Sequence, residues 1–68
     1  MNKELLRYEY RRRGLTAADV ADRIGMHRYT FYKKCNGQSE FTVSEIKSIL
    51  SLLGIEDPVP IFFADEVS

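Results

Sequence analysis

A single glycine separates two short helical patterns in the stretch TAADVADRIGMHRYTFYKKCNGQ, which begins at Thr16. Thr16 can cap the first helix through its hydroxyl group, and Asp19 at the third helical position can partly complete a capping box. Gly25 then suits a tight turn, because glycine adopts the left-handed backbone conformation at little steric cost. The second pattern ends at an Asn-Gly pair that suits the same conformation. This spacing predicts two helices packed across a turn over residues 16–37, and no other feature constrains the fold as strongly.

The N-terminal segment is expected to form a further helix. Residues 2–13 contain neither glycine nor proline, and Leu6 and Tyr10 lie four residues apart on one helical face. Gly14 would end this helix in the left-handed conformation. The same periodicity assigns the inward positions of the following helix pair. The apolar side chains predicted to face inward from these three helices are Leu5, Leu6, Tyr10, Val20, Ala21, Ile24, Met26, Phe31 and Cys35.

The clearest helix signals lie at residues 42–53. Thr42 and Glu45 have the spacing of a capping box, and apolar residues follow at positions i, i+3, i+4 and i+7 until a glycine. These apolar residues are Ile46, Ile49, Leu50 and Leu53. We expect this helix to supply core residues and to brace the pair at 16–37. The prediction is therefore an all-α fold, a compact bundle of four to five short helices in a single domain over residues 1–68.

The apolar tail at residues 57–64 leaves two conformations open. Asp57 followed by Pro58 suits the start of a short helix, in which Asp57 would be the N-cap and Pro58 the first helical residue. The Ile-Phe-Phe run at 61–63 could instead form a short extended segment. Three large apolar residues in a row exceed what one face of a small core can bury. We therefore expect part of this tail to lie at an interface.

Length and composition indicate one small domain. A domain of 68 residues has marginal stability, which oligomerisation would increase. No apolar run approaches 18 residues, and Lys3 is not followed by an apolar segment, so we expect neither a membrane span nor a secretory signal. Cys35 has no second cysteine to pair with, which fits a reducing cytosol. We therefore expect a cytoplasmic protein.

Charge is distributed unevenly along the chain, although the formal net charge is zero. Residues 1–38 carry nine basic and four acidic side chains, a net charge of +5. Residues 39–68 carry one basic and six acidic side chains, a net charge of −5. Such asymmetry can indicate a nucleic-acid-binding face with an acidic back. Solvated charge without a partner is equally consistent with the charges alone.

Enzymatic chemistry is poorly supported by the sequence. The chain has one His and one Cys, eight residues apart, and no glycine-rich loop that could cradle a phosphate. We expect Cys35 to be a small buried apolar residue. For His27, which begins a helix where serine is usual, a phosphate contact and a solvent-facing position both remain open. For the Arg11–Arg13 run a solvated face is favoured over a phosphate contact. No catalytic, cofactor-binding or metal-binding residue is predicted, and no cofactor is expected.

The second helix of the pair presents more polar and aromatic side chains than packing requires. Arg28 and Tyr32 are spaced i, i+4, and so are Tyr29 and Lys33. All four side chains are therefore expected to share one exposed surface. In a recognition helix that enters the major groove, arginine can donate two hydrogen bonds to guanine, and tyrosine can contact thymine methyl groups. Backbone N–H groups of the following loop suit phosphates. The residues predicted to bind double-stranded DNA are His27, Arg28, Tyr29, Tyr32, Lys33, Asn36 and Gln38.

The run LTAADVADRIGMHRYTFYKKCNGQSEFTVSEIKSILSLLGI resembles the Cro/repressor-type helix-turn-helix of phages and Gram-positive bacteria. It is most similar to small members with a "TFY-K-NG-seFt-EI" signature and an "IFF" tail. The resemblance covers about residues 3–63. The features that make it specific are Ala21, Gly25, Phe31, Asn36, Gly37 and the helix start at Phe41–Ile46.

This resemblance implies a five-helix, lambda-repressor-like DNA-binding domain, often dimeric, that regulates transcription. Its base-facing positions correspond to His27, Arg28, Tyr29, Tyr32, Lys33 and Asn36. The chain departs from the family at Ala17, where a glutamine often contacts a phosphate. It departs again at Lys34, which replaces a large apolar residue, so that Cys35 would take over the packing.

The leading hypothesis is a phage-type repressor that binds a palindromic operator as a homodimer. The homodimer contact is predicted at the apolar tail, through Ile61, Phe62 and Phe63. The alternative is a helix-turn-helix adaptor that binds another protein through the same tail and does not bind DNA. The two differ in whether salt-sensitive affinity for duplex DNA exists.

Overall fold

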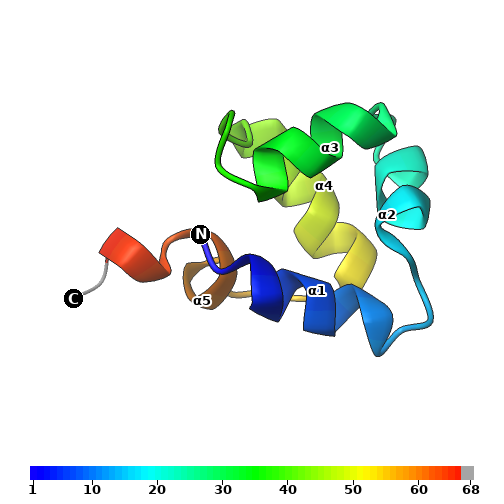
Figure 1. Cartoon of the computed structure of the whole chain (residues 1–68). Coiled ribbons are helices and arrows are strands. Elements are labelled where there is room, and N and C mark those ends of the chain that lie inside the picture. The colour runs from blue at the N-terminus through cyan, green and yellow to red at the C-terminus, as the bar shows by residue number, and fades with distance from the viewer. Residues whose placement is uncertain (67–68) are drawn as a thin grey trace.

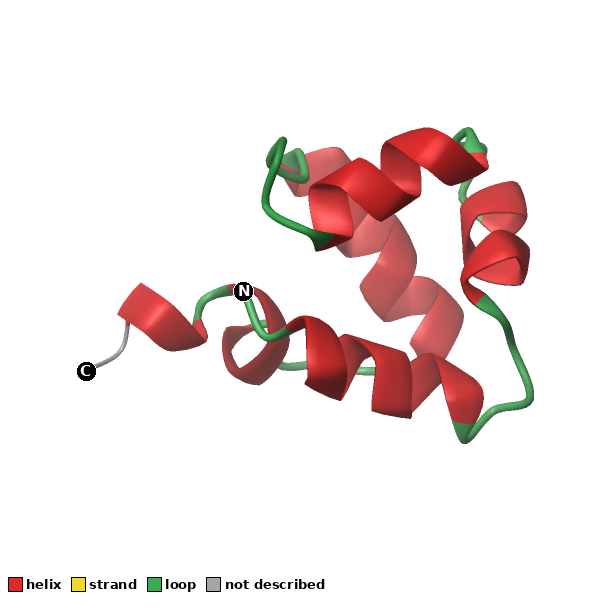
Figure 2. Cartoon of the chain, in the orientation of Figure 1, coloured by secondary structure: helices red, strands yellow, loops and turns green. Residues whose placement is uncertain are grey.

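Five α-helices and one 3-10 turn form the regular structure of residues 1–66, the part of the chain that the computed structural model describes. The described part contains no strand (Figure 2). The helices are α1 (Lys3–Arg11), α2 (Ala17–Arg23), α3 (Arg28–Cys35), α4 (Val43–Leu53) and α5 (Val59–Phe62), and the 3-10 turn is Ala64–Glu66. The predicted all-α class is confirmed. No helix in the described part is both long and apolar enough to span a membrane.

The helices surround one apolar core, with α3 at one edge of the domain and α1 at the opposite edge (Figure 1). In this view α4 crosses between these edges, and α2 joins them at one end. The short helix α5 packs beside the start of α1, where the backbone N–H of Asn2 donates to the carbonyl of Ile61 at 2.6 Å. The buried residues of the core are Leu6, Tyr10, Val20, Ala21, Phe31, Ile49, Leu53, Ile61 and Phe62.

Four aromatic rings in edge-on contact connect the two edges of the domain. The ring of Phe31 lies 6.5 Å from that of Tyr10 and 5.8 Å from that of Phe41, measured between centroids. Phe41 in turn lies 5.7 Å from Phe62. Edge-to-face pairs of this kind add about 0.5–1.5 kcal/mol each to the free energy gained from burial. The series therefore ties α1, α3, the start of α4 and α5 into one unit.

Both predicted capping boxes are present in full. At the start of α2 the backbone N–H of Thr16 donates to Asp19 Oδ2 at 2.8 Å, and the N–H of Asp19 donates to Thr16 Oγ1 at 3.1 Å. Asp19 thus completes the box rather than contributing partly, and the hydrogen bond from the Thr16 backbone lowers its pKa. Thr42 and Glu45 make the same two bonds, also at 2.8 and 3.1 Å. Local spacing alone predicted where these two helices begin.

The end of α3 corrects one detail of the prediction. Of the Asn-Gly pair, only Gly37 adopts the left-handed conformation, with φ at 80°. Asn36 has φ at −89° and closes the helix as its C-cap. A single left-handed residue is enough to reverse the chain, since the N–H of Gln38 then returns to the carbonyl of Lys33 at 3.0 Å.

The tail is helical rather than extended, and it begins one residue later than predicted. Pro58 is the N-cap residue, and Asp57 Oδ1 accepts a hydrogen bond from the N–H of Val59 at 3.0 Å. Ile61 is 2% exposed and Phe62 is 8% exposed, both within the chain's own core.

The expectation of an exposed apolar patch formed by Ile61, Phe62 and Phe63 is therefore wrong for its first two residues. Because α5 packs against α1, both side chains are held in the core, which a run of three apolar residues in the sequence could not show. Phe63 is the one member of the run that is partly exposed.

Lys34, which departs from the family pattern, is nevertheless packed. Its side chain is only 12% exposed, its Nζ atom lies 6.0 Å from the ring centre of Phe41, and it donates to Glu45 Oε1 at 2.5 Å. The aliphatic stem thus replaces the usual apolar side chain, and Glu45 satisfies the charge. Cys35 packs against the core beside Lys34 but is only partly buried, whereas the sequence predicted a buried residue.

Acidification should therefore weaken the contact between α3 and α4. Burial opposes ionisation of Glu45, but hydrogen bonds from Lys34 and from the Thr42 backbone outweigh it, so the pKa of Glu45 lies below its ordinary value of 4.5. A depressed pKa contributes stability that is complete above pH 4.5 and is lost as pH falls through the folded-state pKa. In Glu45→Gln the box can persist, because glutamine also completes capping boxes, but the ion pair cannot.

We expect Glu45→Gln to lower the free energy of unfolding at pH 7 and to reduce its dependence on pH below 4.5. Urea unfolding followed by circular dichroism, between pH 7 and about pH 3, measures both quantities. Glu40→Gln is the matched control, because Glu40 is exposed and forms no ion pair within the described residues. An unchanged pH dependence in Glu45→Gln would show that Glu45 is not the titrating group.

Candidate nucleic-acid interface

The turn between α2 and α3 fixes the direction of α3. Gly25 has φ at 74°, and the following N–H, that of Met26, donates to the carbonyl of Ala21 at 2.9 Å. Ala21 is completely buried, so its small side chain allows the two helices to approach closely. Because Phe31 on the inner face of α3 is held in the core, the opposite face of α3 must point outward.

The outer face of α3 carries a pair of stacked tyrosines. The rings of Tyr29 and Tyr32 lie 6.3 Å apart with an interplanar angle of 15°, and the residues are 59% and 58% exposed. The Nζ atom of Lys33 lies 5.0 Å from the ring centre of Tyr29. The structure thus places these three predicted residues together. None of them is needed to fill the core.

Arg28 begins α3 and is held by a residue that sequence reasoning missed. Its Nη2 atom donates to Asp22 Oδ2 on α2 at 3.2 Å. The two side chains are six positions apart and are joined across a turn. Helical i, i+3 and i, i+4 rules do not connect such positions, so the sequence offered no signal for this pair.

His27 is the N-cap of α3, a role that the sequence did not suggest, and the two roles considered for it both remain open. Its Nδ1 atom accepts a hydrogen bond from the backbone N–H of Tyr29 at 3.1 Å. An imidazole that accepts at Nδ1 has its proton on Nε2, and His27 is exposed, so this N–H is available to an acceptor such as a phosphate oxygen. Histidine is not among the usual capping residues, so the spacing alone did not predict this contact.

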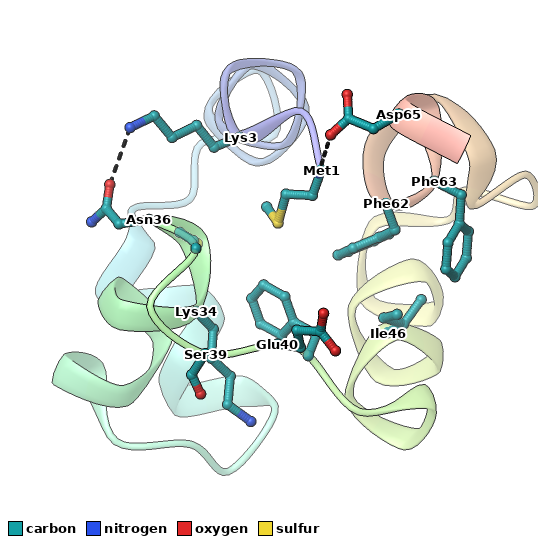
Figure 3. Close-up of a pocket in the computed structure, with 13 residues that line it drawn as sticks. Met1, Lys3, Lys34, Asn36, Ser39, Glu40, Ile46, Phe62, Phe63 and Asp65 are labelled. Carbon is teal, nitrogen blue, oxygen red and sulfur yellow. Dashed lines mark hydrogen bonds and ion pairs between the residues drawn. The ribbon is translucent and has the colours of Figure 1, made fainter. Parts of the chain in front are cut away.

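Asn36 and Gln38, the two remaining residues predicted to contact DNA, differ in whether their side chains are already hydrogen-bonded. The side-chain amide of Asn36 is committed within the domain: Nδ2 donates to the carbonyl of Tyr32 at 3.0 Å, and Oδ1 accepts from Lys3 Nζ at 3.1 Å (Figure 3). Gln38 is exposed, and its side chain makes no hydrogen bond within the part of the chain that the structure describes. Asn36 therefore tethers the end of α3 to α1, whereas Gln38 is free to contact a ligand.

Several basic side chains of residues 1–38 are engaged in ion pairs within the domain. Glu9 Oε1 bonds Arg12 at 2.6 Å and Arg13 at 2.9 Å, and the hydrogen bond from Arg13, followed by that from Arg12, lowers the pKa of Glu9. The arginine run therefore behaves largely as a solvated, paired face, and Arg11 is exposed. Among the described residues, the basic side chains that form no ion pair include Arg7, Arg11, Arg23, Lys33 and Lys47.

A cavity of about 570 Å³ lies between the N-terminus, the loop after α3 and α5 (Figure 3). Its lining includes Cys35, Phe41, Phe62 and Phe63. Burial raises the pKa of Cys35 to about 11, so its thiol remains protonated and is a poor nucleophile at neutral pH. Within the described residues no group of three or more His, Cys, Asp or Glu side chains could hold a metal ion.

Two helices joined by a short glycine turn, the second with a buried inner face and an exposed polar and aromatic outer face, define a helix-turn-helix. A family model described as a helix-turn-helix domain matches residues 4–60. The chain therefore belongs to the helix-turn-helix family, a class associated with DNA binding and regulation. No curated protein and no solved structure gives a significant match to this chain.

The cap contributed by His27 can be tested without any ligand. Loss of an N-cap side chain costs about 0.5–2 kcal/mol, so His27→Ala should lower the free energy of unfolding by that amount. His27→Ser should retain most of the stability, because serine is a preferred capping residue. Urea unfolding compares the two variants, with Gln38→Ala as an exposed control. Equal destabilisation by alanine and serine would contradict the capping role.

Proposed function

We propose that the protein is a transcriptional regulator of the Cro/repressor type that binds double-stranded DNA in a sequence-specific manner. The observation that carries the proposal is the outer face of α3, where Arg28, Tyr29, Tyr32 and Lys33 are presented on a helix whose inner face is anchored by Phe31. Large exposed aromatic side chains stabilise the folded domain little. They lie on the second helix of a helix-turn-helix, and this is the helix that contacts base edges.

Each of these four side chains can interact with a particular group of DNA. Arg28 can donate two parallel hydrogen bonds to guanine O6 and N7. The rings of Tyr29 and Tyr32 offer an apolar surface to thymine methyl groups, and their hydroxyls can bond base edges. Lys33 carries a charge that suits a phosphate. We assign recognition of base edges to Arg28 and the two tyrosines. We assign to Lys33 a phosphate contact that increases affinity without regard to sequence.

The regulator would act as a phage-type repressor, through a homodimer on a palindromic operator. Two copies of α3 would then lie about 34–36 Å apart, one turn of DNA, and the bound dimer would occlude the promoter. Because Ile61 and Phe62 are buried, a contact at the tail would centre on Phe63. One partly exposed ring gives a small interface, so we expect a weak dimer that forms mainly on DNA.

The alternative, an adaptor that binds a partner protein through the Ile61–Phe63 tail and not DNA, loses most of its support. It required an exposed apolar surface, and two of the three side chains that would form it are in the core.

A selection from random duplexes tests the proposed function and the dimer together. We expect a two-fold symmetric motif with half-sites about 10–10.5 base pairs apart, centre to centre. An asymmetric single motif, with a monomer by sedimentation both with and without DNA, would contradict the dimer only. Recovery of no motif, with no salt-sensitive affinity for duplex DNA, would contradict DNA binding itself.

Arg28 and Lys33 should respond differently to alanine substitution. Arg28→Ala should cost about 1–3 kcal/mol on the selected duplex and relax one base position. Lys33→Ala should weaken all sequences alike and reduce the salt slope by about one unit. Fluorescence anisotropy at several salt concentrations distinguishes the two. Uniform weakening by Arg28→Ala would reassign Arg28 as a phosphate contact.

A further inference from the structure

Asp22 and Arg28 occupy the least favourable ends of their helices. Asp22 lies in the last turn of α2, where the helix dipole disfavours an anion, and Arg28 is the first residue of α3, where the dipole disfavours a cation. Neither charge therefore stabilises its own helix. The side chains are 59% and 68% exposed, and ion pairs at such positions contribute little to folding. The pair needs an explanation other than stability.

The geometry of the pair leaves Arg28 free to read a base. One guanidinium N–H, at Nη2, donates to Asp22, whereas a guanidinium has five N–H donors in all. The remaining donors include enough for the two bonds that guanine accepts. Because the turn between α2 and α3 is fixed by the hydrogen bond from Met26 to Ala21, the carboxylate of Asp22 restricts where the guanidinium can lie.

Specific and non-specific binding to DNA would use the Asp22–Arg28 pair differently. On a correct site, Arg28 can bond guanine and Asp22 at once. On an incorrect site, Arg28 gains most by turning to a phosphate, which leaves an unpaired carboxylate close to a polyanion. That cost falls on non-specific binding alone.

We propose that Asp22 is a positioning residue that determines specificity: it lowers the affinity for incorrect sites and raises discrimination for the guanine that Arg28 reads. This inference rests on the proposed function, since it concerns how the same helix face selects its site. Asp22 itself need not touch DNA.

Asp22→Asn tests the inference, because it removes the charge at constant size. Dissociation constants are measured for the selected duplex, for the same duplex with the guanine of Arg28 replaced, and for a random duplex. We expect the random duplex to bind about two- to tenfold more tightly, and discrimination at that guanine to fall by about fivefold or more. The melting temperature should not fall, because an anion is removed from the end of α2 that disfavours it.

Two comparisons separate positioning from charge. Glu56→Gln removes one exposed negative charge from the link between α4 and α5, at the far edge of the domain from α3 (Figure 1), and should leave discrimination unchanged. In an Arg28→Ala background, Asp22→Asn should have no further effect on discrimination, because Asp22 acts through Arg28.

The possible failures are distinguishable. Equal tightening on all three duplexes by Asp22→Asn would reduce Asp22 to a simple repulsive charge and overturn the inference. A loss of preference at a neighbouring base pair that persists in Arg28→Ala would mean that Asp22 accepts directly from a cytosine amino group, which also overturns it. If the wild-type protein shows no sequence preference on any duplex, the proposed function fails, and the inference fails with it.

Discussion

The position of the Phe31 ring is the constraint on which the functional surface depends. This ring is 2% exposed and sits between Tyr10 of α1 and Phe41 at the start of α4. A helix of eight residues has little stability of its own and takes its orientation from packing. With Phe31 fixed on the inner side, the 3.6-residue period of α3 determines which side chains point outward. The outer face of α3, which we propose reads DNA, is in this sense a consequence of the core.

The ends of α3 are also held, and by polar contacts rather than apolar ones. His27 caps the first turn, and the amide of Asn36 joins the last turn to Lys3 of α1. Asp22 accepts a hydrogen bond from Arg28, the first residue of α3. These contacts use residues that would otherwise be assigned to DNA. A small domain has few side chains, so the same residues orient the helix and border the surface proposed to bind DNA.

Much of this arrangement could be predicted from local spacing. The capping boxes at Thr16 and Thr42, the turn at Gly25 and the inward position of Phe31 all depend on residues within about four positions of each other, and such patterns are visible in a sequence.

What could not be predicted depends on contacts between distant residues. The burial of Ile61 and Phe62 requires α5 to pack on α1, which lies 48 or more positions earlier in the chain. The Asp22–Arg28 pair requires a particular turn geometry. The role of Lys34 requires Glu45, eleven positions away in the next helix. In each case the tertiary structure, and not the local pattern, decides what the side chain does.

We propose that the outer face of α3 is the surface that contacts DNA. A titration of the nitrogen-15-labelled protein with its selected duplex, followed by amide chemical shifts, tests this most directly. We expect the largest changes at residues 22 and 27–38, with small changes at residues 59–63 beyond those from dimer formation. Binding with its largest changes on α1 or α5, and with α3 unaffected, would contradict it.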